Sequence, residues 1–271
     1  MSSYTLGHHE SVLRSHRWRT AENSAGYLLP LLPPGASVLD VGCGPGTITA
    51  DLARLVGPSG RVLGVDTSAK VLELAADTAR DAGVTNIDFA VGDIQALGIE
   101  DAAFDVVHAH QVLQHLADPV SALKEMGRVA RPGGVVAARD ADYAAMTWHP
   151  DSDGISRWLA VYRRAARLNG AGPDAGRRLL DWARQAGFDD VVASASVWCF
   201  ATPEDREWWG GLQADRIVHS AVAEQALRAL LADEAELADM AAAWRDWAAD
   251  DSAWFAVLHG EVVCRVPRGA L

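Results

Sequence analysis

The 271-residue sequence has few of the features that mark secreted, membrane or metal-binding proteins. Its three cysteines, Cys43, Cys199 and Cys264, are far apart and form no Cys-x-x-Cys pair, so we expect neither a disulfide framework nor a metal site. No apolar run approaches the ~18 residues that a membrane span requires. The N-terminal segment lacks both the basic and the apolar region of a signal peptide, and we therefore expect a cytoplasmic protein.

Positive charge is also scarce. The 24 Lys and Arg residues are opposed by 36 Asp and Glu, which gives a net charge of −12. Because phosphate binding requires clustered positive charge, we do not expect a nucleic-acid partner. The 49% of hydrophobic and 22% of charged residues are typical of a globular chain, and the length allows one large domain with an added cap.

Tryptophan is almost absent from the first half of the chain. Of ten tryptophans, only Trp18 precedes Trp148. The later tryptophans could fill the core of a helical cap, or they could line an aromatic, amphipathic pocket. The sequence leaves both interpretations open, but it indicates that the two halves have different roles.

Residues 36–140 alternate short β-branched runs with helical patterns, which is typical of βαβ units and a parallel sheet. Strands are expected at residues 37–41, 61–65, 87–91, 106–110 and 135–139. Asp118 and Pro119 are suited to begin a helix, and the run from Arg131 to Gly134 is expected to end it and to turn into the last of these strands.

The flanking segments are predicted to be mainly helical. Residues 8–32 favour one or two short helices, with Thr20 as a cap. After the fifth strand we expect helices at 154–167 and 175–186, a strand at 191–200, helices at 221–231 and 234–247, and a last strand at 257–266.

The strongest chemical signal is the segment Asp40-Val41-Gly42-Cys43-Gly44-Pro45-Gly46-Thr47, in which a buried strand runs into a glycine-rich turn and a helix. Glycines allow close backbone approach to a ligand at the carboxyl end of the first strand. A dinucleotide fingerprint needs its third glycine where Thr47 stands, which disfavours an NAD-dependent oxidoreductase. A carboxylate at Asp40 suits a cationic ligand better than a pyrophosphate. A binding module without a cofactor would leave the glycines unexplained.

This acidic-x-Gly-x-Gly-x-Gly pattern resembles the first motif of class I S-adenosylmethionine-dependent methyltransferases. Asp66 ends the second strand, where a carboxylate can accept both ribose hydroxyls. The resemblance continues in Val91-Gly92-Asp93-Ile94, where the family has an acidic partner for the adenine amino group and an apolar side chain against the ring. It further implies that the segment after the fourth strand lies beside the methionine part of the cofactor. The implied cofactor-binding residues are Asp40, Gly42, Gly44, Gly46, Asp66, Thr67, Asp93, Ile94, His110 and Gln111.

The resemblance implies an α/β fold with a Rossmann-like, mostly parallel sheet, an antiparallel last strand, N-terminal helices and a helical cap. Residues 1–35 would form lid helices, 36–140 the S-adenosylmethionine-binding core, and 141–271 the substrate cap with the last strands. The pattern is most similar to the branch with ubiquinone and menaquinone biosynthesis C-methyltransferases and bacterial natural-product methyltransferases. The signature sequences of the quinone enzymes are absent.

Several residues are candidates for acceptor chemistry. His115, with His110 in reserve, lies close to the fourth strand end and could accept a proton if its pKa stays near 6.5; otherwise it orders the loop before Asp118. Asp142 and Tyr143 follow the fifth strand and are expected to contact the acceptor. Tyr4, His8, His9 and Arg19 would contribute only if the N-terminal helices close over the site.

We therefore expect a methyltransferase that uses S-adenosylmethionine, releases S-adenosylhomocysteine, and methylates an O, N or C atom of a small aromatic or natural-product acceptor. The alternative is an enzyme of secondary metabolism that keeps the fold and cofactor but catalyses a cyclisation. The acceptor, the methylated atom and the formation of a homodimer stay open.

Overall fold

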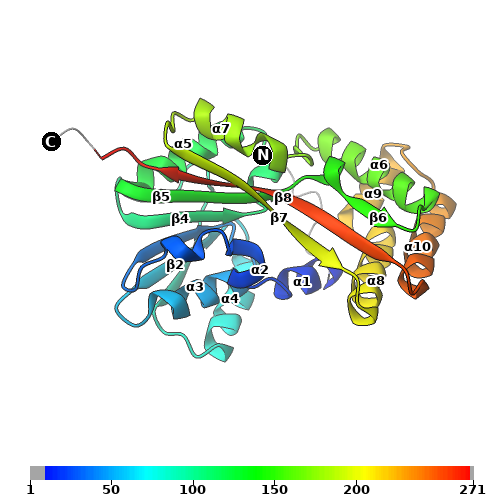
Figure 1. The fold of residues 1–271 in the computed structure, drawn as a ribbon, viewed down its shortest axis with the longest axis horizontal. Coiled ribbons are helices and arrows are strands. Elements are labelled where there is room, and N and C mark those ends of the chain that lie inside the picture. Colours follow the sequence, from blue (N-terminus) through cyan, green and yellow to red (C-terminus); the bar gives the residue numbers. More distant parts are fainter. Residues whose placement is uncertain (1–9, 269–271) are drawn as a thin grey trace.

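The computed structural model describes residues 10–268, and these form an eight-stranded sheet with helices on both faces (Figure 1). The strand order is β3-β2-β1-β4-β5-β8-β6, and β7 pairs with the other edge of β8. The strands are β1 (Ser37–Val41), β2 (Arg61–Asp66), β3 (Ile87–Val91), β4 (Phe104–His110), β5 (Ala130–Ala141), β6 (Thr147–His149), β7 (Val191–Phe200) and β8 (Trp254–Arg265). β1 to β5 are parallel, and β8 is antiparallel to its three neighbours, which confirms the predicted fold class.

Both faces of the central strands β1 and β4 are buried, as expected for a sheet covered by crossover helices. Val38 and Val106 lie in a core with α2 (Ala21–Ala25) and α3 (Thr47–Val56). On the opposite face, the next residue of each strand, Leu39 and Val107, lies in a core with α5 (Pro119–Val129) and α7 (Leu179–Gln185). The remaining crossover helix, α4, spans Ala69–Asp81.

α5 begins at Pro119 and ends at Val129, as predicted, but the segment that follows it differs from the prediction. Asp118 accepts a hydrogen bond from the Ser121 amide at 2.9 Å, and Pro119 is the first helical residue. The predicted turn at Arg131 to Gly134 is wrong, because β5 already begins at Ala130. The register between β4 and β5 shifts after Phe104. The residues that the sequence assigned to a turn therefore belong to the irregular first part of β5.

The N-terminal segment forms two short helices, α1 (Glu10–Arg17) and α2, followed by a 3₁₀ turn η1 (Leu29–Leu31). Thr20 is the N-cap of α2, as predicted: its hydroxyl accepts from the Asn23 amide, and the Asn23 side chain accepts from the Thr20 amide. The segment packs against both the core and the cap, because α2 contacts α3 and α1 contacts α8 (Pro203–His219).

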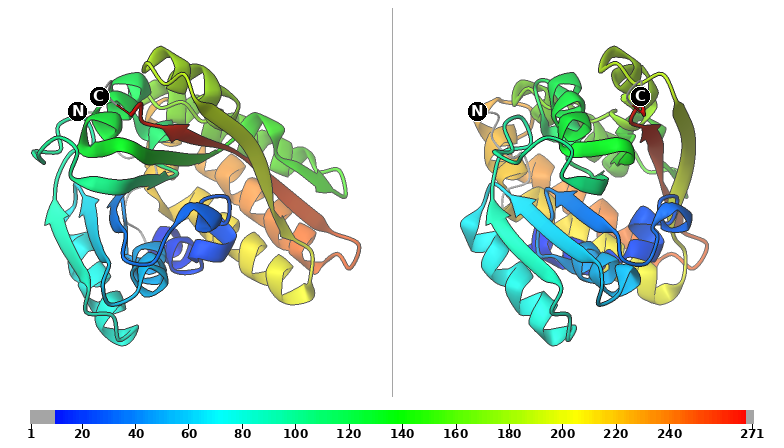
Figure 2. Two further views of the ribbon diagram at one scale, coloured as in Figure 1. Left: turned by 60° about the vertical axis from the view of Figure 1, so that its left-hand side comes forward. Right: turned by 90° about the vertical axis from the view of Figure 1, so that its left-hand side faces the viewer.

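Strand β8 joins the core to the cap. Along one edge it pairs first with β6 and then with β5, while β7 follows its other edge. The β7–β8 ribbon extends past the parallel strands to the cap helices (Figures 1 and 2). These helices are α6 (Asp153–Leu168), α8, α9 (Ala221–Arg228) and α10 (Glu234–Ala249).

Most tryptophans of the second half are core residues. Trp158, Trp209, Trp244 and Trp247 are buried in one cluster within the cap, and the rings of Trp158 and Trp244 meet edge to face at 5.0 Å. This arrangement matches the interpretation of large aromatics as core filling.

Helix α8 and strand β6 were not predicted. α8 contains Gly210 and Gly211, which lower helix propensity, although Thr202 and Pro203 are good start signals. A Cβ at Gly210 would lie 2.8 Å from the Trp244 carbonyl oxygen, so the glycine permits close packing of α8 on α10. β6 has only three residues and forms through its pairing with β8. None of the helices in residues 10–268 combines the length and hydropathy needed to cross a bilayer.

Candidate functional site

A cavity of about 560 Å³ lies at the carboxyl ends of β1, β2, β3 and β4. Crossover connections bring these ends to one edge of the sheet, where open α/β sheets bind ligands. Of the residues predicted to bind the cofactor, all except Gly46 line this cavity. His115 also lines it, and the N-terminal segment contributes His16 and Arg19.

The three glycines of the turn after β1 have different roles, although all have positive φ angles. A Cβ at Gly42 would lie 2.3 Å from Val112 Cγ2, and one at Gly46 would lie 2.9 Å from Ala75 Cβ. These two glycines are therefore required for packing. A Cβ at Gly44 would meet only His16 Nδ1, at 3.8 Å, so the space beside Gly44 is open to the cavity.

Asp66 connects the glycine turn to the start of α4. Its Oδ2 accepts from the Gly44 amide at 3.1 Å, and its Oδ1 accepts from the Ser68 amide at 3.0 Å. Each carboxylate oxygen has further lone pairs, so a half-buried Asp66 can still accept hydrogen bonds from a ligand diol. Thr67 lies next to it on the cavity wall.

Asp93 and Ile94 form the far end of the cavity. Asp93 is exposed and its Oδ1 accepts from the Gln95 amide at 2.9 Å. Ile94 is buried and provides an apolar surface beside it. An acidic acceptor next to an apolar wall fits a flat ring that carries an amino group.

The carboxylate of Asp40 is held inside the protein. Its Oδ1 is 2.8 Å from His108 Nδ1, and its Oδ2 accepts from Thr49 Oγ1 at 2.6 Å. Asp40 thereby ties β1 to β4 and α3. Its charge lies beside the cavity, but both oxygens are already engaged, so its effect on a ligand would be electrostatic.

Gln111 connects the N-terminal segment to β8 across the cavity. Arg19 Nη2 donates to Gln111 Oε1 at 2.9 Å, and Gln111 Nε2 donates to His259 Nε2 at 2.8 Å. His259 Nδ1 in turn donates to the Val257 carbonyl at 3.1 Å. Gln111 has a φ of +54°, an unfavourable value for a non-glycine residue that is typical of functional sites.

His110 is the least satisfied polar side chain on the cavity wall. It is only 5% exposed, and neither ring nitrogen has a hydrogen-bond partner among the described residues. Burial lowers its pKa well below the usual value, and the nearby charges of Arg19 and Arg139 add to this effect. His110 is therefore neutral near pH 7, with one donor and one acceptor nitrogen.

The expectation of an ordinary pKa near 6.5 for His115 is wrong. Burial and, to a smaller extent, the charge of Arg19 lower its pKa to about 3. Its Nε2 lies 3.1 Å from Gln114 Nε2, an arrangement in which His115 accepts the hydrogen bond. His115 lies on the cavity wall as predicted, but it is a weak base there.

The predicted acceptor residues lie elsewhere. Asp142 is buried outside the cavity lining, and its carboxylate accepts from Arg177 Nε and Nη2 at 2.5 and 2.8 Å. Tyr143 is buried in the cap, where it stacks on Tyr162 at 4.3 Å. Tyr4 lies outside the described residues. The sequence analysis missed His16, for which the local sequence gives no signal, because only the docking of α1 brings it to the cavity.

No group of three or more His, Cys, Asp or Glu side chains within residues 10–268 is arranged to hold a metal ion.

Residues 32–187 match the family model described as a methyltransferase domain. The chain is 36% identical over 275 residues to an uncharacterized methyltransferase of Schizosaccharomyces pombe, with 96% of this chain and 95% of that protein aligned. It is 30% identical over 280 residues to a probable methyltransferase of Aspergillus luteorubrus, with 97% and 96% aligned. It is also similar to the demethylmenaquinone methyltransferase of Lactococcus lactis, at 39% identity over 134 residues covering 49% and 48% of the two chains.

Solved structures share the fold at lower identity. The cyclase SpnF is 24% identical, with a TM-score of 0.52 over 95% of this chain and 80% of that one. Phosphoethanolamine N-methyltransferase 2 of Haemonchus contortus, solved with S-adenosylhomocysteine, is 20% identical, with a TM-score of 0.55 over 89% and 52% of the chains. At these identities the similarity shows the fold alone.

Proposed function

The chain belongs to the methyltransferase domain family and is a class I S-adenosylmethionine-dependent methyltransferase, and from this premise we propose that it methylates an O, N or C atom of a small aromatic or natural-product acceptor. The observation that carries the proposal is that one cavity is lined by all the implied cofactor-binding residues except Gly46, and that one of them, His110, is a buried polar side chain without a partner among the described residues.

We propose that the cavity residues divide between cofactor and acceptor. Asp66 would hold the ribose diol, Asp93 and Ile94 the adenine, and the open face of Gly44 the amino-acid part. The geometry described above fits these roles, since each group faces the cavity with unused acceptor or apolar surface. When bound, S-adenosylmethionine supplies a methyl group on a positively charged sulfur.

In this proposal the protein contributes mainly alignment and exclusion of water. His110 would orient the acceptor through its free ring nitrogens. Because the pKa values of His110 and His115 lie below the usual range, neither is a strong base near pH 7. A residue with such a pKa can accept a hydrogen bond from a hydroxyl or amine and receive its proton as the new bond forms.

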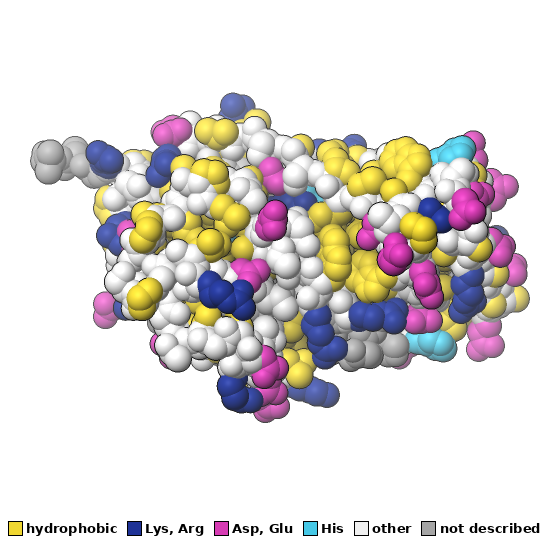
Figure 3. Space-filling view, turned by 60° about the horizontal axis from the view of Figure 1, so that its bottom comes forward, with side chains coloured by type: hydrophobic (Ala, Val, Ile, Leu, Met, Phe, Trp, Pro, Cys, Tyr) yellow, Lys and Arg dark blue, Asp and Glu magenta, His cyan; other side chains and the backbone are white. Residues whose placement is uncertain are grey.

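We propose that residues 1–35 close one side of this cavity and that the cap in residues 141–271 selects the acceptor. Support comes from Arg19 and Trp18: Arg19 bonds Gln111, and Trp18 packs on Trp198 at 5.1 Å, which ties the N-terminal segment to β4 and β7. We propose that the enzyme acts on a small molecule in the cytoplasm; the net charge of −12 supports the absence of a nucleic-acid partner. Figure 3 shows acidic side chains gathered at the end of the molecule where the cap helices lie.

The test is a metabolite screen with a labelled methyl donor, followed by mass spectrometry. We expect a product about 14 Da heavier than its acceptor and formation of S-adenosylhomocysteine. A product of unchanged mass would instead favour the cyclase-type alternative. Isothermal titration that detects no binding of either S-adenosyl compound would contradict the proposal as a whole.

Replacement of His110 tests its assignment. We expect His110→Ala to lower kcat/KM for the acceptor by roughly 100-fold, the lower range for a positioned proton acceptor. Because His115 already accepts a hydrogen bond from Gln114, His115→Ala should lower it less. For the wild-type enzyme, kcat should not show a histidine ionisation between pH 6 and 8. If His115→Ala lowered kcat/KM more than His110→Ala did, and kcat of the wild-type enzyme changed with an apparent pKa near 6.5, the proton acceptor would be His115.

A further inference from the structure

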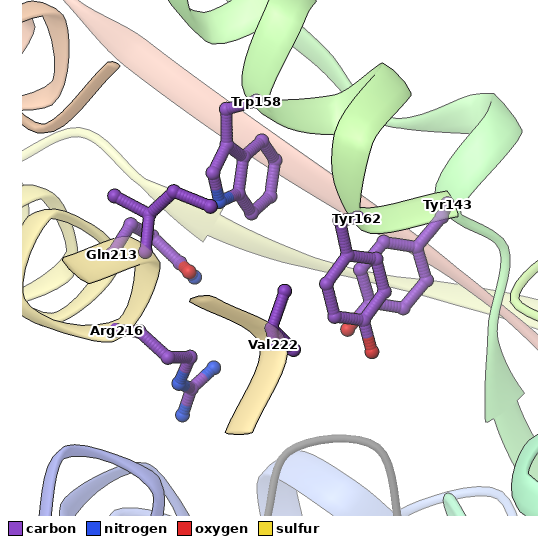
Figure 4. Close-up of a pocket in the computed structure, with 7 residues that line it drawn as sticks. Tyr143, Trp158, Tyr162, Gln213, Arg216 and Val222 are labelled. Atoms are coloured by element: carbon purple, nitrogen blue, oxygen red, sulfur yellow. The ribbon is translucent and has the colours of Figure 1, made fainter. Parts of the chain in front are cut away.

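A small pocket in the cap is part of the packed core. It lies between α6, α8, α9 and the 3₁₀ turn η3 (Tyr143–Ala145), and the stacked rings of Tyr143 and Tyr162 form one side of it (Figure 4). Its free volume of about 10 Å³ is enough for one water molecule. This pocket therefore has no room for a larger ligand, whereas one edge of the sheet is open to a partner.

Strand β7 forms that open edge. Its ten residues, Val191–Phe200, all pair with β8 along one side. Within residues 10–268 no strand pairs with its other side. In the right-hand view of Figure 2, β7 runs along the outer margin of the molecule. The N–H and C=O groups along an open edge are available to pair with a further strand.

The β7 edge lacks the features that usually protect an edge strand from pairing. β7 contains no proline and no charged residue, and its register with β8 is uninterrupted, so no bulge turns the strand away. By contrast, β3 at the far end of the sheet has five residues, of which Asp88 is charged and exposed, and β6 has only three. β7 is therefore a long and unprotected edge, which favours a partner strand along it.

The side chains of β7 leave room for a second strand. Val192 and Val197 are 64% and 52% exposed, and Ala193, Ser194 and Ala195 between them are also exposed. Alanine and serine are small enough for a strand to approach to the usual spacing of about 4.8 Å. Because the chain has a net charge of −12, a ten-residue strip without charge is a place where two copies can meet with little repulsion.

The sequence of β7 is compatible with itself in the antiparallel direction. If Ala195 lies opposite Ala195 of a second copy, Ser194 lies opposite Ser196, and Ala193 lies opposite Val197. Asp190, just before β7, would then be separated from its counterpart by ten residues, or roughly 30 Å, which exceeds the screening length of about 8–10 Å. A parallel arrangement would instead place the two Asp190 carboxylates side by side.

We propose that β7 pairs with β7 of a second copy of this chain, antiparallel and about a two-fold axis at Ala195, so that a homodimer contains one continuous sheet. A closed two-fold dimer uses this edge of both copies and leaves neither exposed. The proposal does not depend on the acceptor or on the proposed function. The alternative occupant is an extended segment of a different protein.

The test is size-exclusion chromatography with multi-angle light scattering of the full chain at tens of micromolar. We expect the wild-type protein to have twice the 28.9 kDa mass of one chain. Ala195→Lys and Ala195→Asp each place like charges opposite each other at the two-fold axis, so each variant alone should have the mass of one chain. An equimolar mixture of the two variants should recover the double mass, because the facing charges then have opposite signs.

Ala90→Lys, at an exposed alanine of β3, is the matched control and should remain dimeric. Because Ala195 is exposed, both Ala195 variants should keep the far-UV circular dichroism spectrum of the wild type. A wild-type protein with the mass of one chain would overturn the proposal and leave β7 to a segment of another protein. A dimer that persists in Ala195→Lys, or a mixture that stays monomeric, would also overturn it, since the copies would not meet at Ala195.

Discussion

At the residue scale, Asp66 combines two tasks that substitutions can separate. Its oxygens accept from the Gly44 and Ser68 amides, so it shapes the turn, and it faces the cavity, where we propose it binds the ribose diol. Asp66→Ala should weaken binding of S-adenosylhomocysteine by at least about tenfold, because charge-assisted hydrogen bonds contribute ~1.5–3 kcal/mol each. Isothermal titration measures this. Asp66→Asn keeps the shape of the side chain and should weaken binding less than Asp66→Ala. If a folded Asp66→Ala protein bound S-adenosylhomocysteine with normal affinity, the ribose diol would be bound by other residues.

The glycine turn offers a second residue-scale contrast. Gly42→Ala would force a Cβ to 2.3 Å from Val112 and should mainly lower the Tm. At Gly44 a Cβ meets only His16, at 3.8 Å, so Gly44→Ala has the strain of its φ of +55° but no clash with the protein. We expect Gly44→Ala to reduce cofactor affinity more, and Tm less, than Gly42→Ala. The reverse order in thermal melts and titrations would show that Gly44 has no ligand beside it.

At the element scale, α5 depends on a cap that the sequence already shows. Asp118 is exposed and accepts from the Ser121 amide, so Asp118→Ala should cost about 1 kcal/mol of folding free energy. For a chain of this size the loss corresponds to a Tm lower by about 2–4 °C. Asp118→Asn is the control and should retain most of the stability, since an amide oxygen also caps a helix. Equal Tm values for Asp118→Ala and wild type would mean that packing alone positions α5.

Other elements depend on partners that are distant in sequence. α8 contains two glycines, and Gly210 is needed where the helix approaches the Trp244 backbone of α10. β6 exists because residues 254–256 of β8 lie beside it. Local propensity therefore predicted α5 from its own residues but could not predict α8 or β6, whose signals are in the neighbouring element.

At the scale of the whole molecule, buried histidines should make the fold sensitive to acid. Burial lowers the pKa of His110, His115 and His259, the second to about 3, so the folded state keeps them neutral. The unfolded chain binds these protons below pH ~6.5, and the stability that these groups contribute is full above that pH and is lost as pH falls toward 3. Asp140 acts in the opposite direction, because burial raises its pKa to about 7 and its contribution is lost as pH rises from about 4 to 7.

Between pH 6 and pH 5 the three histidines are protonated mainly in the unfolded chain, whereas Asp140 is protonated mainly in the folded protein. The unfolded chain therefore binds about two protons more than the folded protein, and the free energy of unfolding should fall by about 2–3 kcal/mol over this range. Urea titrations at pH 5, 6 and 7 measure it. Asp140→Asn removes the opposing contribution and should steepen the loss. A free energy of unfolding that stays constant or increases on acidification would show that these histidines are protonated in the folded protein.

The sequence by itself determined the parallel core, the cofactor class and the places of the strand-end residues. Gly44, Asp66 and Asp93 each lie at or just after the end of a strand, and parallel strands must bring their carboxyl ends to one edge, so order along the chain was sufficient to place them together. The caps at Thr20 and Asp118 were readable for a similar reason, because their hydrogen bonds span three residues.

Only the tertiary structure decided which polar groups remain available for chemistry. Asp142 follows β5 as expected, but Arg177 reaches its carboxylate from 35 positions away. His115 stands where the sequence put it, yet burial and Arg19 change its basicity. The docking of the N-terminal helix brings His16 to the large cavity and Ser15 to Arg216 of α8. The hydrogen-bond partner, the burial and the pKa of a side chain depend on contacts between segments that are distant in sequence, so a local sequence pattern cannot predict them.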